Sequence, residues 1–156
     1  MTTLASSSTS TDADRRPIDV RGPRFGAAVT TVVLAITLLT IPSTLSVVLL
    51  AVQTVAFALG SLVGLQAQPY GVLFRRVVRP RLAPPTEFED PAPPRFAQTV
   101  VLGFALVGLV GLLAGATTVA YVAVGFALAA AFLNAVFAYC LGCEVYLIGK
   151  RVLSRS

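Results

Sequence analysis

The sequence predicts an all-α membrane protein with four transmembrane helices. Two stretches, residues 26–74 and 96–143, contain no Asp, Glu, Lys or Arg. Each stretch accommodates two apolar runs of about 20 residues, and a helix of that length crosses a hydrocarbon core of about 30 Å. The 156 residues are 12% charged, whereas soluble domains carry about 25% charged residues. Lipid is therefore the expected solvent for most of the chain.

The predicted spans fill one domain of residues 17–151. Its four helices are expected at residues 25–41, 46–65, 96–116 and 119–139, with an extension of the last helix to Ile148 as an alternative. Short uncharged turns, at residues 42–44 and 115–118, join the helices within each pair.

Two tails flank this domain. Residues 1–16 are rich in Ser and Thr and predict a disordered tail, and residues 152–156 form a short C-terminal one. The N-terminal tail lacks the apolar core of a signal peptide, so we expect the first span to be retained.

The twelve Lys and Arg residues all lie on the same side of the predicted spans. Because positive charge is retained on the cytoplasmic side, this distribution predicts an inner-membrane protein with both termini and the central loop in the cytoplasm. The cations flank spans, where they contact anionic lipid headgroups, so nucleic acid is not an expected partner.

The central loop, residues 66–95, divides into two parts. Residues 71–79 predict an amphipathic helix on the membrane surface, whose cations we expect to contact lipid headgroups or a partner: Arg75, Arg76, Arg79 and, just beyond, Arg81. Residues 80–95 contain six prolines, which disfavour a helix and indicate an extended connector or docking segment.

A motif occurs twice, 71 residues apart. The first copy comprises Asp19, Pro23, Arg24 and Phe25, and the second comprises Asp90, Pro94, Arg95 and Phe96. Duplication of a two-helix hairpin would give two repeated helical hairpins. Alternatively, the same interfacial chemistry arose twice, because Pro at a helix start and Arg beside an aromatic residue suit any membrane boundary.

Packing within the membrane also has candidates in the sequence. Gln53 and Asn134 lie inside predicted spans and are expected to hydrogen-bond each other or the backbone of a neighbouring helix. Glycine pairs four residues apart, such as Gly60 and Gly64, permit close approach of helices within one chain or, alternatively, between the chains of a homo-oligomer.

The main chemical motif is Cys140-Leu-Gly-Cys143-Glu144, which holds both cysteines of the chain. A pair with this spacing is able to cycle between dithiol and disulfide or to hold sulfur as a persulfide. If the fourth helix continued through the motif, the pair would lie near a helix C-terminus. The helix dipole and Glu144 would then both disfavour thiolate there, unless Gly142 ended the helix.

Other chemistries have weaker support. The chain has no His, which excludes an imidazole base and His-ligated metal, so no cofactor is expected. Two thiolates do not complete a zinc site within one chain, although a symmetric dimer would supply four. A reducing cytoplasm disfavours a permanent disulfide. The thiol pair, a metal site and two cysteines without chemistry thus remain alternatives.

Several segments together resemble a family of small bacterial membrane proteins of unknown function, numbered 4395 among the domains of unknown function. The resemblance rests on the doubled Arg-Phe motif, Gln68-Pro-Tyr, the Pro-rich segment and Cys140-Leu-Gly-Cys-Glu, and is closest to actinobacterial members. Members encoded near thioredoxin-like or rhodanese-type sulfur-transfer proteins imply a thiol or sulfur role for Cys140 and Cys143.

The sequence therefore supports two hypotheses of function. The first is a thiol–disulfide or sulfur relay through Cys140 and Cys143, with Glu144 assisting proton transfer and a soluble thioredoxin-like or sulfurtransferase partner. The second is a non-enzymatic scaffold or accessory subunit that docks a partner through the Pro-rich loop. Transport is less favoured, because no charged residue lies inside the predicted spans.

Overall fold

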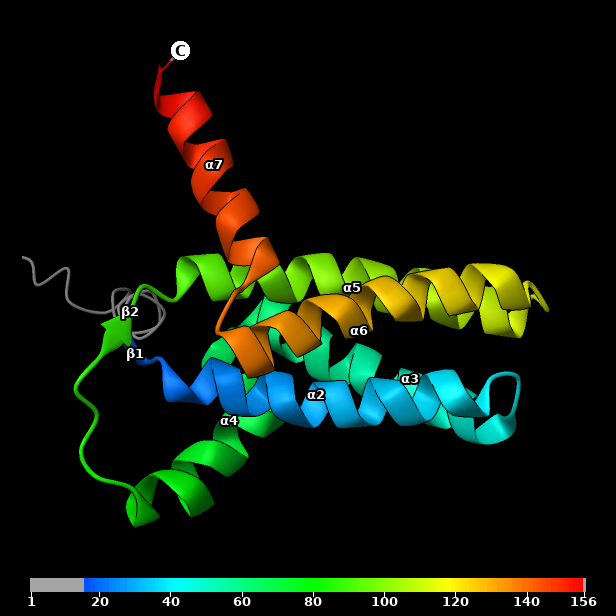
Figure 1. The fold of residues 1–156 in the computed structure, drawn as a ribbon, viewed down its shortest axis with the longest axis horizontal. Coiled ribbons are helices and arrows are strands. Elements are labelled where there is room, and N and C mark those ends of the chain that lie inside the picture. Colours follow the sequence, from blue (N-terminus) through cyan, green and yellow to red (C-terminus); the bar gives the residue numbers. More distant parts are fainter. Residues whose placement is uncertain (1–15, 156) are drawn as a thin grey trace, which may run out of the picture.

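A computed structural model describes residues 16–155, and four long helices dominate it (Figure 1). These are α2 (Arg21–Thr40), α3 (Thr44–Ala58, continued by the π-helical turn η1, Leu59–Val63), α5 (Ala92–Leu113) and α6 (Thr117–Phe137). All four are long and apolar enough to cross a membrane. Most of the predicted N-terminal tail lies outside the described residues.

The first and third helices begin four residues earlier than the sequence predicted, at Arg21 and Ala92. Both include prolines in their first turn, where the backbone N–H has no partner within the helix and its loss costs nothing. The prolines thus lie inside the helices and not ahead of them.

The turn between α2 and α3 gives α3 a capping box, in which Ser43 and Ser46 exchange side-chain and backbone hydrogen bonds.

The four helices form a bundle in which α2 and α5 lie at opposite corners. Each of them packs on both α3 and α6. The two turns, between α2 and α3 and between α5 and α6, lie together at one end of the bundle (Figure 1). Leu34, Leu50, Phe57 and Val124 are fully enclosed in the core. Alanines on α6 face this core and let neighbouring helices approach closely.

Shorter elements gather at the other end, where the helices carry their charged residues. After α3 the chain reverses at Gly64 (φ 139°) and passes through a 3₁₀ turn, η2 (Leu65–Ala67). A helical segment of changing pitch follows, made of α4 (Pro69–Leu73), η3 (Phe74–Val78) and η4 (Arg79–Arg81). The predicted helix at residues 71–79 thus exists, although it begins earlier and is not purely α-helical.

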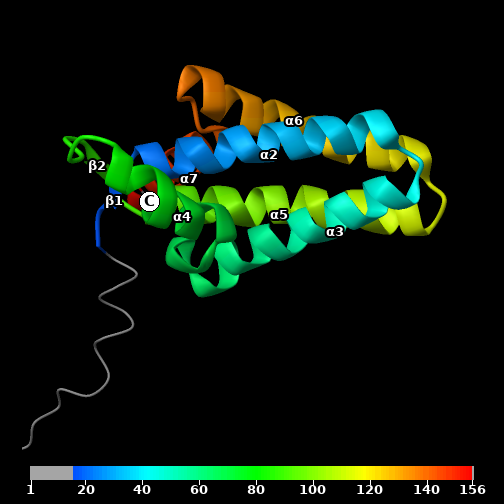
Figure 2. The same cartoon turned by 90° about the horizontal axis from the view of Figure 1, so that it is seen from below.

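Two further elements complete this end. Strand β1 (Ile18–Asp19) pairs antiparallel with β2 (Phe88–Glu89), which ties the central loop to the start of α2. The last helix, α7 (Leu141–Arg155), leaves the bundle and crosses its axis, as Figures 1 and 2 show.

The two copies of the repeated motif make the same backbone hydrogen bond, and both of its partners are shifted by 71 residues. The backbone N–H of Arg21 donates to Asp19 Oδ1 over 3.0 Å. The N–H of Ala92 donates to Asp90 Oδ1 over 2.9 Å. Each aspartate thus satisfies a donor at the start of its own helix, α2 or α5.

The aromatic residues of the motif make similar ring contacts, although their partners lie 72 residues apart. Phe25 lies 5.8 Å from Phe74, and Phe96 lies 5.6 Å from Tyr146, measured between ring centroids. Each pair joins the first helix of a half to the short helix that ends that half. The two halves therefore share an order of long helix, turn, long helix and short helix.

The arginines of the motif complete the correspondence by crossing between halves. Arg95 on α5 donates to the carbonyl oxygens of Ser61 and Leu62, at the end of α3, over 2.9 and 3.1 Å. Arg24 on α2 donates to Ala135 O, near the end of α6, over 3.5 Å. Cations at these carbonyls also complement the negative ends of the helix dipoles. The two copies of the motif therefore make similar contacts at the starts of α2 and α5.

Candidate functional site

The fourth long helix ends before the cysteine motif. Ala138 has a left-handed backbone (φ 55°, ψ 26°), and its N–H and that of Tyr139 both donate to Leu133 O. A left-handed residue at this place ends an α-helix, because the chain leaves the helical path. The alternative that the fourth span continues to Ile148 is therefore wrong.

The cysteines lie at the start of the new helix, α7. Cys140 immediately precedes its first residue, and Cys143 is the third residue within it. Their Cα atoms are 5.1 Å apart, within the range that a disulfide spans, and a disulfide joins their sulfur atoms. The backbone N–H of Cys143 also donates to Cys140 Sγ over 3.2 Å. Cys140 thus occupies the position of an N-cap, with its sulfur as the accepting atom.

This position reverses the electrostatic expectation made from the sequence. That expectation placed the pair near a helix C-terminus, where the dipole disfavours thiolate. At a helix N-terminus the partial charge is positive and the free N–H groups point toward the capping atom, so negative charge on sulfur is stabilised. The expectation was wrong because it assumed one unbroken helix through Ala138.

The neighbours of the pair also differ from those of an unbroken helix. Cys140 and Cys143 are half-buried, whereas Glu144 is exposed in the first turn of α7. Tyr146 packs on Phe96 of α5. Tyr139 lies before α7 and is exposed. The motif therefore places two bonded sulfurs at the start of α7, with an exposed carboxylate on the next residue of the chain.

Gly142, between the cysteines, lets α7 approach α5 closely. A Cβ atom on Gly142 would lie 2.6 Å from Ala97 Cβ and 2.7 Å from Ala97 Cα. Contacts that short do not occur between real atoms, so any side chain at residue 142 would move α7 away from α5. The backbone between Cys140 and Cys143 is therefore held directly against a membrane-spanning helix.

The cations of the central loop form a second group. Arg75, Arg76, Arg79 and Arg81 are all exposed on the segment of residues 69–81. Arg75 donates to Gln66 O over 2.6 Å, which leaves the remainder of its guanidinium at the surface. Phe74, on the opposite face, is buried against α2 beside Gly22 and Phe25. The predicted amphipathic arrangement is present, although its largest apolar side chain contacts protein.

This second group does not lie on the same helix as the cysteines. In Figure 1 the segment that begins with α4 and the helix α7 leave the bundle toward opposite sides. The predicted cysteine site and the predicted cations of the central loop thus lie on different helices.

A polar contact inside the bundle was not predicted. Tyr70 donates its hydroxyl hydrogen to Oε1 of Gln53, a side chain that is fully buried on α3. The structure therefore does not support a bond between Gln53 and Asn134. Gln53 Nε2 has no partner among the described residues. Burial raises the pKa of the Tyr70 hydroxyl, which keeps it protonated and able to donate.

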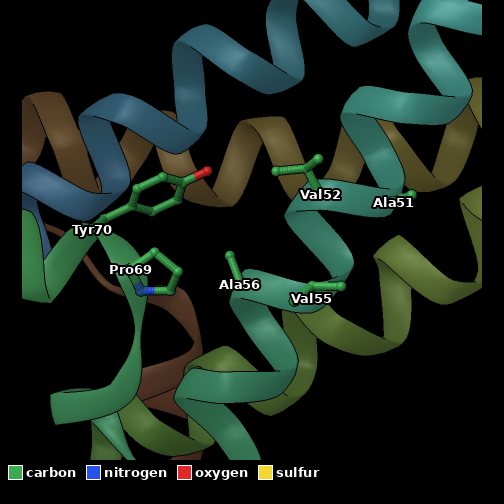
Figure 3. Close-up of a pocket in the computed structure, with 6 residues that line it drawn as sticks. All are labelled: Ala51, Val52, Val55, Ala56, Pro69 and Tyr70. Atoms are coloured by element: carbon green, nitrogen blue, oxygen red, sulfur yellow. The ribbon is translucent and has the colours of Figure 1, made fainter.

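Tyr70 also lines a shallow cavity of about 350 Å³ (Figure 3). The other lining residues are Ala51, Val52, Val55, Ala56 and Pro69. The cavity is apolar except for the tyrosine. The sequence signal for this region was Gln68-Pro69-Tyr70, which only the family resemblance had singled out.

Within residues 16–155, no group of three or more His, Cys, Asp or Glu side chains lies close enough to hold a metal ion. Glu144 is the acidic residue in the first turn of α7. At the start of α7 the described residues thus hold a disulfide and an exposed carboxylate.

Comparison with known proteins gives one match. Residues 18–151 match the family described as Domain of unknown function (DUF4395). No curated protein and no solved structure matches the chain.

Proposed function

The chain belongs to the DUF4395 family of unknown function, so from its own residues we propose a thiol–disulfide or sulfane-sulfur relay at Cys140 and Cys143. The single observation that supports this proposal most is the N-terminal position of the pair on α7, with the Cys143 N–H donating to Cys140 Sγ. Thiol oxidoreductases with a low-pKa cysteine place that residue at a helix N-terminus, where thiolate is stabilised.

Cys140 is the attacking residue in this proposal, and Cys143 is the resolving one. The Cys140 thiolate attacks one sulfur of a partner's disulfide, and the other partner sulfur leaves as a thiolate that takes up a proton. The Cys143 thiolate then attacks Cys140 Sγ and releases the second partner thiol. Two electrons pass to the partner, whose disulfide becomes a dithiol, while Cys140 and Cys143 become the disulfide.

Sulfur transfer uses the same first step without net oxidation. The Cys140 thiolate attacks the outer sulfur of a partner's persulfide, and the partner leaves as a thiolate, so that the persulfide now resides on Cys140. Glu144, exposed beside Cys143, is placed to exchange the protons that these steps release and consume. The partner class that fits is a soluble thioredoxin-like or rhodanese-type sulfurtransferase protein.

The proposed location is the inner membrane, with both termini and the central loop in the cytoplasm. The two turns between long helices contain no charge and lie at one end of the bundle. Among residues 16–155, Arg16 precedes β1, and the other cations lie at the starts of α2 and α5, on the segment of residues 69–81 and on α7. Because positive charge is retained in the cytoplasm, this distribution supports a cytoplasmic location for that end and for the cysteine pair.

Trapping of a mixed disulfide tests the proposal. The full-length Cys143→Ser variant retains the attacking residue but lacks the resolving one, so a partner disulfide should remain attached to Cys140. Acid quenching of intact cells, followed by non-reducing electrophoresis and mass spectrometry, should recover a covalent complex that dithiothreitol releases. The matched control is Cys140→Ser, which should give little complex.

Two results would contradict the relay. One is an equal yield of complex from both variants. The other is differential alkylation that finds two free thiols in the native protein under both resting and oxidising conditions.

The central loop supports the scaffold as a second candidate. Its segment of residues 82–88 is mostly exposed, including Leu82 and Phe88, and extends away from the bundle (Figure 1). Substituting Pro84 and Pro85 by Ala should then abolish partner capture while both cysteine variants retain it. The relay predicts instead that the Pro84 and Pro85 variant retains capture and that Cys140→Ser loses it.

A further inference from the structure

Helix α7 presents an apolar stripe that no part of the described protein covers. Leu141, Val145, Ile148 and Val152 recur at intervals of three and four residues and therefore share one face of the helix. They are 38%, 57%, 58% and 63% exposed, respectively. None of the fifteen residues of α7 is buried. A row of four large aliphatic side chains thus faces outward along the whole helix.

The stripe is distinct from the face that holds α7 on the bundle. Gly142 and Tyr146 make the contacts with Ala97 and Phe96 of α5. A helix turns by about 100° per residue, so this face lies roughly 100° or more from the stripe. The contact with α5 therefore fixes the orientation of α7 without covering its apolar side.

The charges of α7 have one dominant sign. Lys150, Arg151 and Arg155 lie in its second half, and Glu144 is its sole acidic residue. Arg151 and Arg155 lie one turn apart, beside the apolar stripe. An exposed aliphatic row bordered by cations is the composition of a helix that lies in the boundary between lipid headgroups and acyl chains.

The orientation of α7 suits that location. The helix crosses the axis of the four long helices and lies at the end of the bundle where their charged residues gather (Figures 1 and 2). If the four helices span a bilayer, its surface passes through this end, parallel to α7. The segment of residues 69–81 occupies the corresponding place in the first half of the chain, and it too bears exposed cations.

We infer that α7 is an interfacial helix that lies on an anionic lipid surface, with Leu141, Val145, Ile148 and Val152 among the acyl chains. Arg151 and Arg155, beside the stripe, contact the headgroup phosphates. The lipid covers the stripe that the protein leaves exposed, and the cations select anionic over zwitterionic headgroups. This inference concerns the surface of α7 and does not depend on whether the cysteines undergo thiol exchange.

Spin-label accessibility tests the inference in the full-length protein. Val145→Cys and Val152→Cys place a nitroxide on the stripe, and Ser154→Cys, on the opposite side of α7, is the matched control. Each is made in a Cys140→Ser/Cys143→Ser background and reconstituted in vesicles of phosphatidylcholine and phosphatidylglycerol. Molecular oxygen concentrates in acyl chains and a nickel chelate concentrates in water. Oxygen should therefore relax the two stripe labels more strongly, and the chelate should relax the control label more strongly.

Three results would overturn the inference. Stripe labels that respond to the chelate like the control would place α7 in water. Stripe labels shielded from both reagents would place it against protein, such as a second copy. The third contrary result is a nitroxide at residue 152 that lies equally deep in the bilayer with and without phosphatidylglycerol. Arg151→Gln together with Arg155→Gln should abolish the dependence of that depth on phosphatidylglycerol.

A second measurement retains the native cysteines, because removing them also removes the disulfide at the start of α7. Benzoylphenylalanine at residue 148 of the otherwise unchanged chain should, on illumination, add the mass of a phospholipid. Cross-linking to a second copy of the chain, or no cross-link to lipid, would contradict the inference. Benzoylphenylalanine in place of Ser154 is the control, and it should give no lipid adduct.

Discussion

The backbone N–H of Cys143 lies 3.2 Å from Sγ of Cys140 and donates to it. The two cysteines are therefore not equivalent, although both occur in one short motif. Cys140 accepts at the start of α7, whereas Cys143 lies within the first turn and supplies the donor. In the reduced protein this geometry stabilises negative charge on Cys140 more than on Cys143.

Single-cysteine variants should reveal this difference in reactivity. Cys143→Ser leaves Cys140 alone, and Cys140→Ser leaves Cys143 alone. With iodoacetamide at neutral pH, the remaining Cys140 should react about fivefold faster than the remaining Cys143, which corresponds to about 1 kcal/mol of helix-terminus stabilisation of thiolate. Mass spectrometry of quenched samples gives both rates. Equal rates, or a faster Cys143, would contradict Cys140 as the attacking residue.

Gly142→Ala should displace α7 from α5. The added methyl group would lie 2.6 Å from Ala97 Cβ, and overpacking of this kind costs about 1–3 kcal/mol. We expect a lower thermal midpoint in detergent and slower disulfide formation. Gly149→Ala is the matched control, because a Cβ there meets no atom within 4 Å. It should stabilise α7 by about 0.5–1 kcal/mol. Similar effects of the two substitutions would argue against the close contact.

Tyr70→Phe should destabilise the bundle through Gln53. Removal of the hydroxyl leaves the buried Gln53 Oε1 without its hydrogen-bond donor. The expected cost is about 1–2 kcal/mol, since buried amides are expensive in an apolar surrounding. Adding Gln53→Leu should recover most of the loss, because the unpaired group is then gone. Urea or SDS titration of the single and double variants measures this. Additive losses would show that the two residues act independently.

Glu89→Gln should stabilise the pairing of β1 with β2 at neutral pH. Burial raises the pKa of Glu89, so the folded state binds a proton more tightly than the unfolded state. The stability of the native protein therefore falls as pH rises from about 4.3, the ordinary pKa of Glu, through the raised folded value. Glu89→Gln has no carboxyl group to ionise, so its stability does not fall in this way as pH rises.

The pH profile of unfolding distinguishes this effect from general stabilisation. The advantage of Glu89→Gln should be largest near pH 7 and absent below about pH 4, where the unfolded state is also protonated. Glu87→Gln, exposed in the same loop, is the control and should change little. An advantage for Glu89→Gln that does not depend on pH would rule out this explanation.

The long helices were predictable because charge and apolar length alone define membrane spans. Their starts were misplaced by four residues, since Pro23 and Pro94 lie inside the first turns and not ahead of them. The end of α6 was harder to predict. Ala138 adopts a left-handed backbone without being Gly or Asn, and no proline follows it before α7. Local composition thus contained little indication of the break.

In the candidate site, too, the sequence predicted some features and not others. The spacing of Cys140 and Cys143 was evident, but their electrostatic surroundings depend on the break at Ala138 and were predicted with the wrong sign. The contact of Tyr70 with Gln53 depends on the chain reversal at Gly64, and sequence spacing does not encode where a reversed segment returns. Such contacts require the packed structure.

The doubled contacts have a consequence for comparing the two halves of this protein. Under the 72-residue shift that relates Phe74 to Tyr146, Gln68 at the start of α4 corresponds to Cys140 at the start of α7. Gly71 then corresponds to Cys143. One half thus bears both sulfurs, whereas the corresponding residues of the other half are an amide and a glycine. The first half is therefore an internal reference for the second, because a short helix starts at the same place in it without a thiol.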